Sequence, residues 1–83
     1  MKPKKNIFVT SRAIQGKMYL INKHEAYLLD SVEQFIWENI DGENTIEDII
    51  QKVAKKYNED PNNIEQDLKE FFESLKEHNL IRY

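Results

Sequence analysis

The stretch at residues 27–42, YLLDSVEQFIWENIDG, indicates how the whole chain is organised. Its pattern is that of an apolar strand that runs directly into a capped helix. Asp30 or Ser31 can cap this helix by accepting a hydrogen bond from an unpaired backbone N–H, and a Glu or Gln at the third helical position suits a capping box. Apolar residues then recur at helical spacing, as far as Ile40. Gly42 is expected to end the helix, since glycine accepts a left-handed conformation.

The residues before this stretch predict an antiparallel meander over residues 7–29. Its strands are expected at 7–10, reaching toward Ala13, then at 17–21 and at 25–29, because these segments are rich in β-branched and aromatic residues. Residues 1–6 are polar and contain a proline, so we expect them to be disordered. Such a small sheet needs helices to cover its apolar face.

The residues after it predict two further helices, so that residues 31–81 hold three in all. Thr45 and Asp48 fit a second capping box. Pro61 suits the first position of a third helix that reaches about His78. The apolar stripe of that helix is about 60° wide and leaves Phe72 at its edge, with room to face something else. Leu80-Ile81 is expected to fold back against the core.

The fold class predicted is therefore α+β: a three-stranded antiparallel sheet followed by a three-helix bundle, similar to a winged helix-turn-helix. The 83 residues are expected to form a single domain, 1–83, with a small core. There is no cysteine, and no apolar run is long enough to span a membrane. The N-terminus lacks the apolar stretch of a signal peptide, so a cytoplasmic protein is expected.

The inventory of catalytic residues is small. The two histidines, His24 and His78, are far apart in sequence and have no second ligand at metal-binding spacing. Gly16 and Gly42 are the only glycines, so no phosphate-binding loop is present. We expect no enzyme activity, no cofactor and no metal, and we interpret the chain as a binding module.

A winged-helix outline makes a DNA-binding regulator the alternative function. The formal net charge is −3, and the third helix carries more acidic than basic residues. That charge would oppose contact with phosphates, so nucleic acid is not an expected partner. An enzyme is the third alternative.

A small sheet can also recognise a partner by its edge. If Glu25–Leu29 is a border strand, its unpaired N–H and C=O groups can accept an extended peptide as an added strand. The third helix would form the other wall. Phe72 lies on one side of its apolar stripe, and a mostly polar flank lies on the other. The sequence leaves open which of the two sides meets the peptide. Those flank residues are Asp67, Phe71, Ser74 and His78. A purely structural role for Tyr27, Leu29, Phe71 and Leu75 is the competing interpretation.

The order and spacing of these segments resemble the PqqD-like family, the recognition elements that bind leader peptides of ribosomally made, post-translationally modified peptides. The matching residues are Leu29-Asp30-Ser31, Phe35–Gly42, Thr45–Ile50, Tyr57, Asp67-Leu68, Phe71-Phe72, Leu75 and Asn79–Ile81. Glu33 departs from the family pattern, where a small residue is frequent, and Asn79 stands where glycine is common.

This resemblance implies that a leader peptide pairs antiparallel with the third strand and lies between that strand and the third helix. The candidate peptide-binding residues are Glu25, Ala26, Tyr27, Leu28, Leu29, Asp67, Phe71, Phe72, Ser74, Leu75 and His78.

The chain also resembles the freestanding form of the element. Its partners would then be a precursor peptide and a separate maturation enzyme, either a leader peptidase or a radical SAM enzyme. The Phe35-Ile36-Trp37 helix is more similar to lasso-pathway members. A monomer is expected, with an edge-strand dimer as the alternative.

Overall fold

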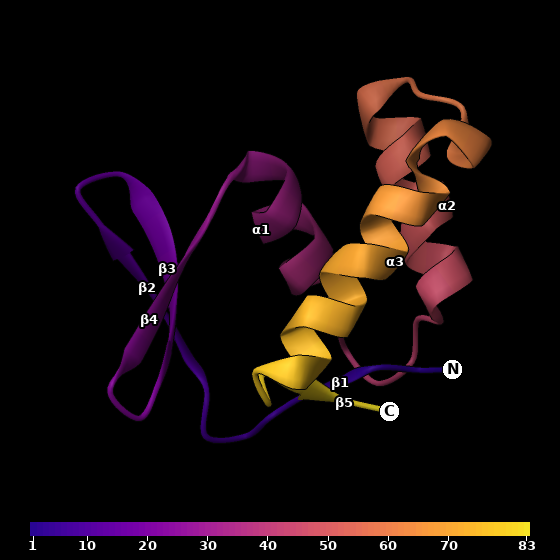
Figure 1. Cartoon of the computed structure of the whole chain (residues 1–83). Helices are drawn as coiled ribbons and strands as arrows, with labels where there is room; N and C mark the ends of the chain where they lie inside the picture. Colours follow the sequence, from indigo (N-terminus) through magenta and orange to yellow (C-terminus); the bar gives the residue numbers. More distant parts are fainter.

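A computed structural model describes the whole chain, residues 1–83, and places a three-stranded sheet beside three helices (Figure 1). The strands β2 (Thr10–Ile14), β3 (Lys17–Asn22) and β4 (Glu25–Leu29) form an antiparallel sheet in the order β2-β3-β4. The helices are α1 (Ser31–Glu38), α2 (Ile46–Tyr57) and α3 (Pro61–Glu77). α1 lies between the sheet and the pair formed by α2 and α3. The predicted α+β fold class is confirmed.

Tight turns set the register of the sheet. Gln15 and Gly16 connect β2 to β3 and both have positive φ, at 52° and 78°, as a type I′ hairpin turn requires. Lys23-His24 is the turn between β3 and β4, and Asn22 pairs with Glu25 across it. The strand at 25–29 therefore has the predicted bounds, and it feeds straight into α1 through Asp30.

Side-chain caps start the helices at the positions that the sequence indicates. Asp30, not Ser31, caps α1: its carboxylate accepts from the N–H of Glu33 at 2.8 Å, and the Glu33 carboxylate accepts from the N–H of Asp30 at 2.9 Å. Thr45 and Asp48 form the same reciprocal pair at α2. Pro61 is the first residue of α3, as predicted.

The first helix ends earlier than predicted. It stops at Glu38 and not at Gly42. The side-chain amide of Asn39 donates to the carbonyl of Phe35 at 2.8 Å, which satisfies one of the last free carbonyls of the helix. The Asp41 carboxylate then accepts hydrogen bonds from the N–H groups of Glu43 and Asn44. These short polar side chains compete with the helical backbone bonds and end the helix.

The N-terminal residues are ordered, so the prediction of disorder at 1–6 is wrong. Strand β1 (Lys4–Lys5) pairs antiparallel with strand β5 (Ile81–Arg82), beneath the C-terminal end of α3 (Figure 1). Pro3 is fully buried, and its carbonyl accepts from the N–H of Gly42 at 3.1 Å. The polar composition of this segment did not indicate the pairing, because backbone hydrogen bonds hold these residues in place.

The first strand of the sheet is also displaced from its predicted position. It begins at Thr10, whereas Ile7 and Phe8 lie in an exposed turn. Asn6 forms this turn: its side chain accepts from the N–H of Phe8, and its carbonyl accepts from the N–H of Val9, each at 3.0 Å. Local bonding by Asn thus overrode the β-propensity of the Ile-Phe-Val run.

One continuous core joins the sheet to the helices. Leu20 and Leu29 of the sheet contact a cluster with Ile36 of α1 and Phe72 of α3. Leu80 and Ile81 are buried in the same cluster, as predicted for a chain that folds back after α3. α1 is therefore held on both sides, and it fixes the separation between β4 and α3.

Candidate peptide-binding site

The free edge of β4 carries the unpaired backbone groups that define the candidate site. Asn22 and Glu25 flank a two-residue turn, so they form a hydrogen-bonded pair, and such pairs alternate along an antiparallel ladder. Tyr27 and Leu29 therefore also direct their backbone groups toward β3. Ala26 and Leu28 direct their N–H and C=O groups away from β3, to the free edge of the sheet.

The side chains of β4 alternate between the core and the solvent. Leu29 is buried and Tyr27 is half-buried, whereas Leu28 is 53% exposed on the opposite face. The residues with outward backbone groups, Ala26 and Leu28, thus also have exposed side chains, as does Glu25 at the start of the strand. β4 is anchored by alternate residues while its edge stays accessible.

One flank of α3 lies on the β4 side of the molecule. The ring of His78 packs edge-on against the ring of Tyr27, with centroids 5.1 Å apart. The same line along the helix continues through Asp67, Phe71 and Ser74. Each of these residues lies three or four positions before the next one, and Ser74 lies four before His78. We call these four residues the open flank. Phe71 is half-buried and the other three are exposed.

The contact between Tyr27 and His78 carries its own polar network. The hydroxyl of Tyr27 donates to the Glu25 carboxylate at 3.0 Å. Partial burial of the ring raises the pKa of Tyr27 above its usual value, and the hydrogen bond to Glu25 raises it further. Nδ1 of His78 lies 2.8 Å from the carbonyl of Ser74, so Nδ1 carries the proton and Nε2 is free to face a ligand.

Two of the predicted site residues on α3 are not accessible. Phe72 is 0% exposed and Leu75 is 3% exposed, so neither can contact a peptide on the surface. The prediction that Phe72 faces outward is wrong because the chain termini cover its side of α3: Met1 and Tyr83 line a small hollow with it. The structure thus leaves the open flank as the side of α3 that is available beside β4.

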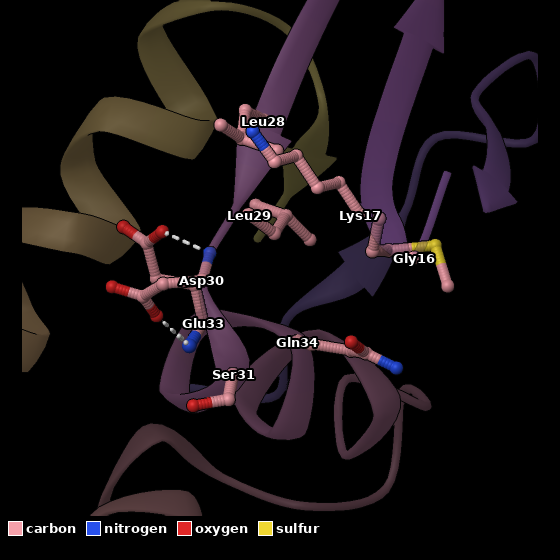
Figure 2. Close-up of a pocket in the computed structure, with 9 residues that line it drawn as sticks. Gly16, Lys17, Leu28, Leu29, Asp30, Ser31, Glu33 and Gln34 are labelled. Carbon is pink, nitrogen blue, oxygen red and sulfur yellow. Dashed lines mark hydrogen bonds between the residues drawn. The ribbon is translucent and has the colours of Figure 1, made fainter. Parts of the chain in front are cut away.

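A hollow of about 420 Å³ lies at the Leu29 end of β4 (Figure 2). Its apolar surface comes from Met18, Leu28 and Leu29, and Lys17 borders it. The capping box of α1, shown by the two dashed bonds in Figure 2, forms the floor beside these residues. A second hollow, of about 640 Å³, lies at the Glu25 end of β4.

Sequence reasoning included Glu25 and His78 of the second hollow but missed its other residues. Phe8 and Asn6 line it together with His78 and Asn79 from the end of α3. The sequence predicted Phe8 to be part of a strand, so its place beside the end of α3 could not be anticipated. The Asn at position 6 was the available signal, because Asn frequently forms such turns.

The structure offers no other site that suggests chemistry. No three acidic or histidine side chains lie close enough together to hold a metal ion. None of the helices has the length and apolar character needed to cross a bilayer. The one ion pair, between Lys69 and Glu65, is exposed and lies within a single helix.

Comparison with known proteins places the chain in a family. Residues 17–81 match the family described as coenzyme PQQ synthesis protein D (PqqD). A search of the curated proteins finds no match. Among solved structures, the chain is similar to TbiB1 in complex with the TbiA(beta) leader peptide, with 25% identity, a TM-score of 0.82, and coverage of 95% of this chain and 94% of that one.

It is also similar in fold to a lasso peptide synthetase B1 complexed with the leader peptide. That likeness has 16% identity and a TM-score of 0.84, and it covers both chains completely. The family match includes β3, β4, all three helices and the start of β5. The chain therefore belongs to the PqqD family.

Proposed function

We propose that this protein binds the leader segment of a ribosomally made precursor peptide as a strand added to β4. The observation that carries the proposal is the free edge of β4 beside the open flank of α3. Ala26 and Leu28 present unpaired N–H and C=O groups there. An extended peptide satisfies both kinds of group at once, and side chains beside the edge then select its sequence.

The added strand would run antiparallel to β4. The existing sheet is antiparallel throughout, and antiparallel ladders are slightly more stable per residue than parallel ones. The peptide would therefore enter at the Leu29 end of β4 and leave at the Glu25 end. Phe71 supplies the apolar wall on α3, while Asp67, Ser74 and His78 supply polar contacts.

The solved relatives support this assignment. Both similar structures are described as complexes with a leader peptide. One of them is described as a lasso peptide synthetase B1, which favours a lasso peptide pathway over the quinone pathway for which the family is named. In this proposal the protein is not a catalyst: it holds the leader and delivers the rest of the precursor to a separate maturation enzyme, most simply a leader peptidase. Tethering raises the effective concentration of the substrate at that enzyme.

A backbone amide NMR titration tests this function. The ¹⁵N-labelled protein is titrated with the synthetic leader region of the precursor peptide encoded beside its gene, and with a scrambled peptide of the same composition. We expect shifts at Glu25–Leu29 and along the open flank with the leader alone. Shifts confined to β2, or equal responses to both peptides, would overturn the proposal.

A further inference from the structure

We infer that the hollow at the Glu25 end of β4 is a second peptide subsite, which binds the leader residues immediately C-terminal to the segment paired with β4. The inference rests on the proposed function. It extends that function from strand pairing to a specific downstream contact, in which Asn6 and Phe8 of the N-terminal segment join Glu25 and His78.

The direction of the added strand selects this hollow. A peptide antiparallel to β4 runs from Leu29 toward Glu25, and it reaches the place where β4 and α3 meet at the Tyr27–His78 contact. The hollow borders that contact, because Glu25 and His78 both line it. The peptide residues that follow the paired segment must therefore pass over the hollow on their way toward the maturation enzyme.

The loop that forms the far wall is held in place by hydrogen bonds at its base. The amide of Asn6 donates to the carbonyl of Asn79 at 2.7 Å, and the backbone N–H of Asn6 donates to the carbonyl of Leu80 at 3.0 Å. The Asn6 side chain also accepts from the N–H of Phe8. This loop therefore presents the ring of Phe8, 77% exposed, at a fixed position relative to the end of α3.

The lining of the hollow suits an extended peptide with one apolar side chain. The side-chain amides of Asn22 and Asn79 line it and have no hydrogen-bond partner within the chain. An amide both donates and accepts, as a peptide bond does, so these two groups match a passing backbone. Phe8 is the only apolar residue of the lining. It offers an aromatic face to one apolar or aromatic side chain of the leader.

Three peptides and a matched pair of variants test the inference. The first peptide is the minimal leader segment that shifts the amides of β4; the second adds its next six residues at the C-terminus; the third adds the six residues before it at the N-terminus. Ile7 is 79% exposed in the same loop but does not line the hollow, so Ile7→Ala is the control for Phe8→Ala. Both side chains are exposed, and both variants should fold.

We expect the C-terminal extension to tighten binding about tenfold in a calorimetric titration, and Phe8→Ala to abolish that gain. Ile7→Ala should leave the gain intact, and neither variant should change the affinity for the minimal or the N-terminally extended peptide. Asn79→Gly keeps the left-handed backbone at φ 58° and removes the amide, so it should reduce the gain in part.

Two results would overturn the inference while leaving the proposed function intact. One is equal affinity of the wild-type protein for the minimal and the C-terminally extended peptides. The other is an equal effect of Phe8→Ala and Ile7→Ala on the extended peptide. If no peptide binds to β4 at all, the proposed function fails, and this subsite fails with it.

Discussion

The two sides of α3 differ more than their sequences suggest. We call Lys69, Phe72, Glu73 and Lys76 the closed flank, because the chain termini lie against it and only Phe72 among the four is buried. Tyr83 donates to Glu73 at 3.1 Å and lies under the Nζ of Lys76, 4.6 Å from the ring centroid. The carbonyl of Met1 accepts from the N–H of Ile46, the first residue of α2. The open flank has no such cover.

The adjacent phenylalanines on these flanks, Phe71 and Phe72, differ in burial. Phe72 is fully buried, whereas Phe71 is half-buried at the edge of the core, and their ring centroids are 6.5 Å apart. The closed flank binds the protein's own termini, and the open flank lies beside a strand whose edge is unpaired. We therefore expect the closed flank to determine stability and the open flank to determine recognition.

Phe72→Ala should have the largest effect. Removing a fully buried phenylalanine leaves a cavity and costs about 3–5 kcal/mol of unfolding free energy. Urea denaturation followed by circular dichroism measures that loss. A loss below about 1 kcal/mol would mean that the termini do not hold this flank closed, and the contrast between the two flanks would break.

Phe71→Ala is the paired change on the open flank. A half-buried ring should contribute less to folding, so we expect a loss of about 1 kcal/mol in stability. The affinity for the leader should fall about tenfold, since an aromatic side chain beside the bound strand is a typical anchor. The same denaturation and an isothermal titration separate the two effects. A folded variant with unchanged affinity would remove Phe71 from the site.

How much of this contrast could be predicted from sequence depends on how local its causes are. The cap at Thr45 and the first-helix cap, which the sequence placed at Asp30 or Ser31, follow from short-range chemistry and were predicted. The edge strand 25–29 was predicted for the same reason. Phe72 lies on the side of α3 where the two chain termini meet, and there β1 pairs with β5 from the opposite end of the chain, as the Lys4–Arg82 and Lys5–Ile81 pairs show. No local pattern indicates such a pairing.

The candidate site was predicted only in outline, because a local pattern does not show what a helix face contacts. The periodicity of α3 places Asp67, Phe71, Ser74 and His78 on one side, but it does not say what that side faces. The Tyr27–His78 contact shows that this side of α3 faces β4. The contact depends on α1, which holds β4 and α3 at a suitable distance. Phe8 was missed because a local turn displaced it from the predicted strand.

A pH titration of stability should give the smallest effect, and that effect should come from the capping box of α2. Hydrogen bonds from Thr45 hold the pKa of Asp48 below its ordinary value of 3.8, helped by the charges of Lys52 and Lys2. A depressed pKa in the folded state means that the stabilisation is complete above the unfolded pKa and is lost as the pH falls through the folded pKa.

Asp48→Asn should therefore differ from the wild type by a constant amount of unfolding free energy near neutral pH, and by progressively less below about pH 4. Thermal unfolding from pH 7 to pH 2.5 measures this convergence. Parallel curves over the whole range would show that the charge of Asp48 does not stabilise the cap.

The sheet contains an internal control for strand addition at β4. β2 and β4 are both edge strands, and in each the outward N–H groups follow from the register: those of Ser11 and Ala13 in β2, and those of Ala26 and Leu28 in β4. Only β4 has the open flank beside it. A proline at an outward position removes one free N–H without breaking a bond to β3.

The most direct measurement is the leader affinity of Leu28→Pro, set against Leu28→Ala and Ala13→Pro, with the fold of each variant checked by its amide spectrum. Strand addition to β4 predicts that Leu28→Pro binds about tenfold more weakly than Leu28→Ala, while Ala13→Pro binds like the wild type. A folded Leu28→Pro variant that binds as tightly as Leu28→Ala would contradict strand addition at this edge.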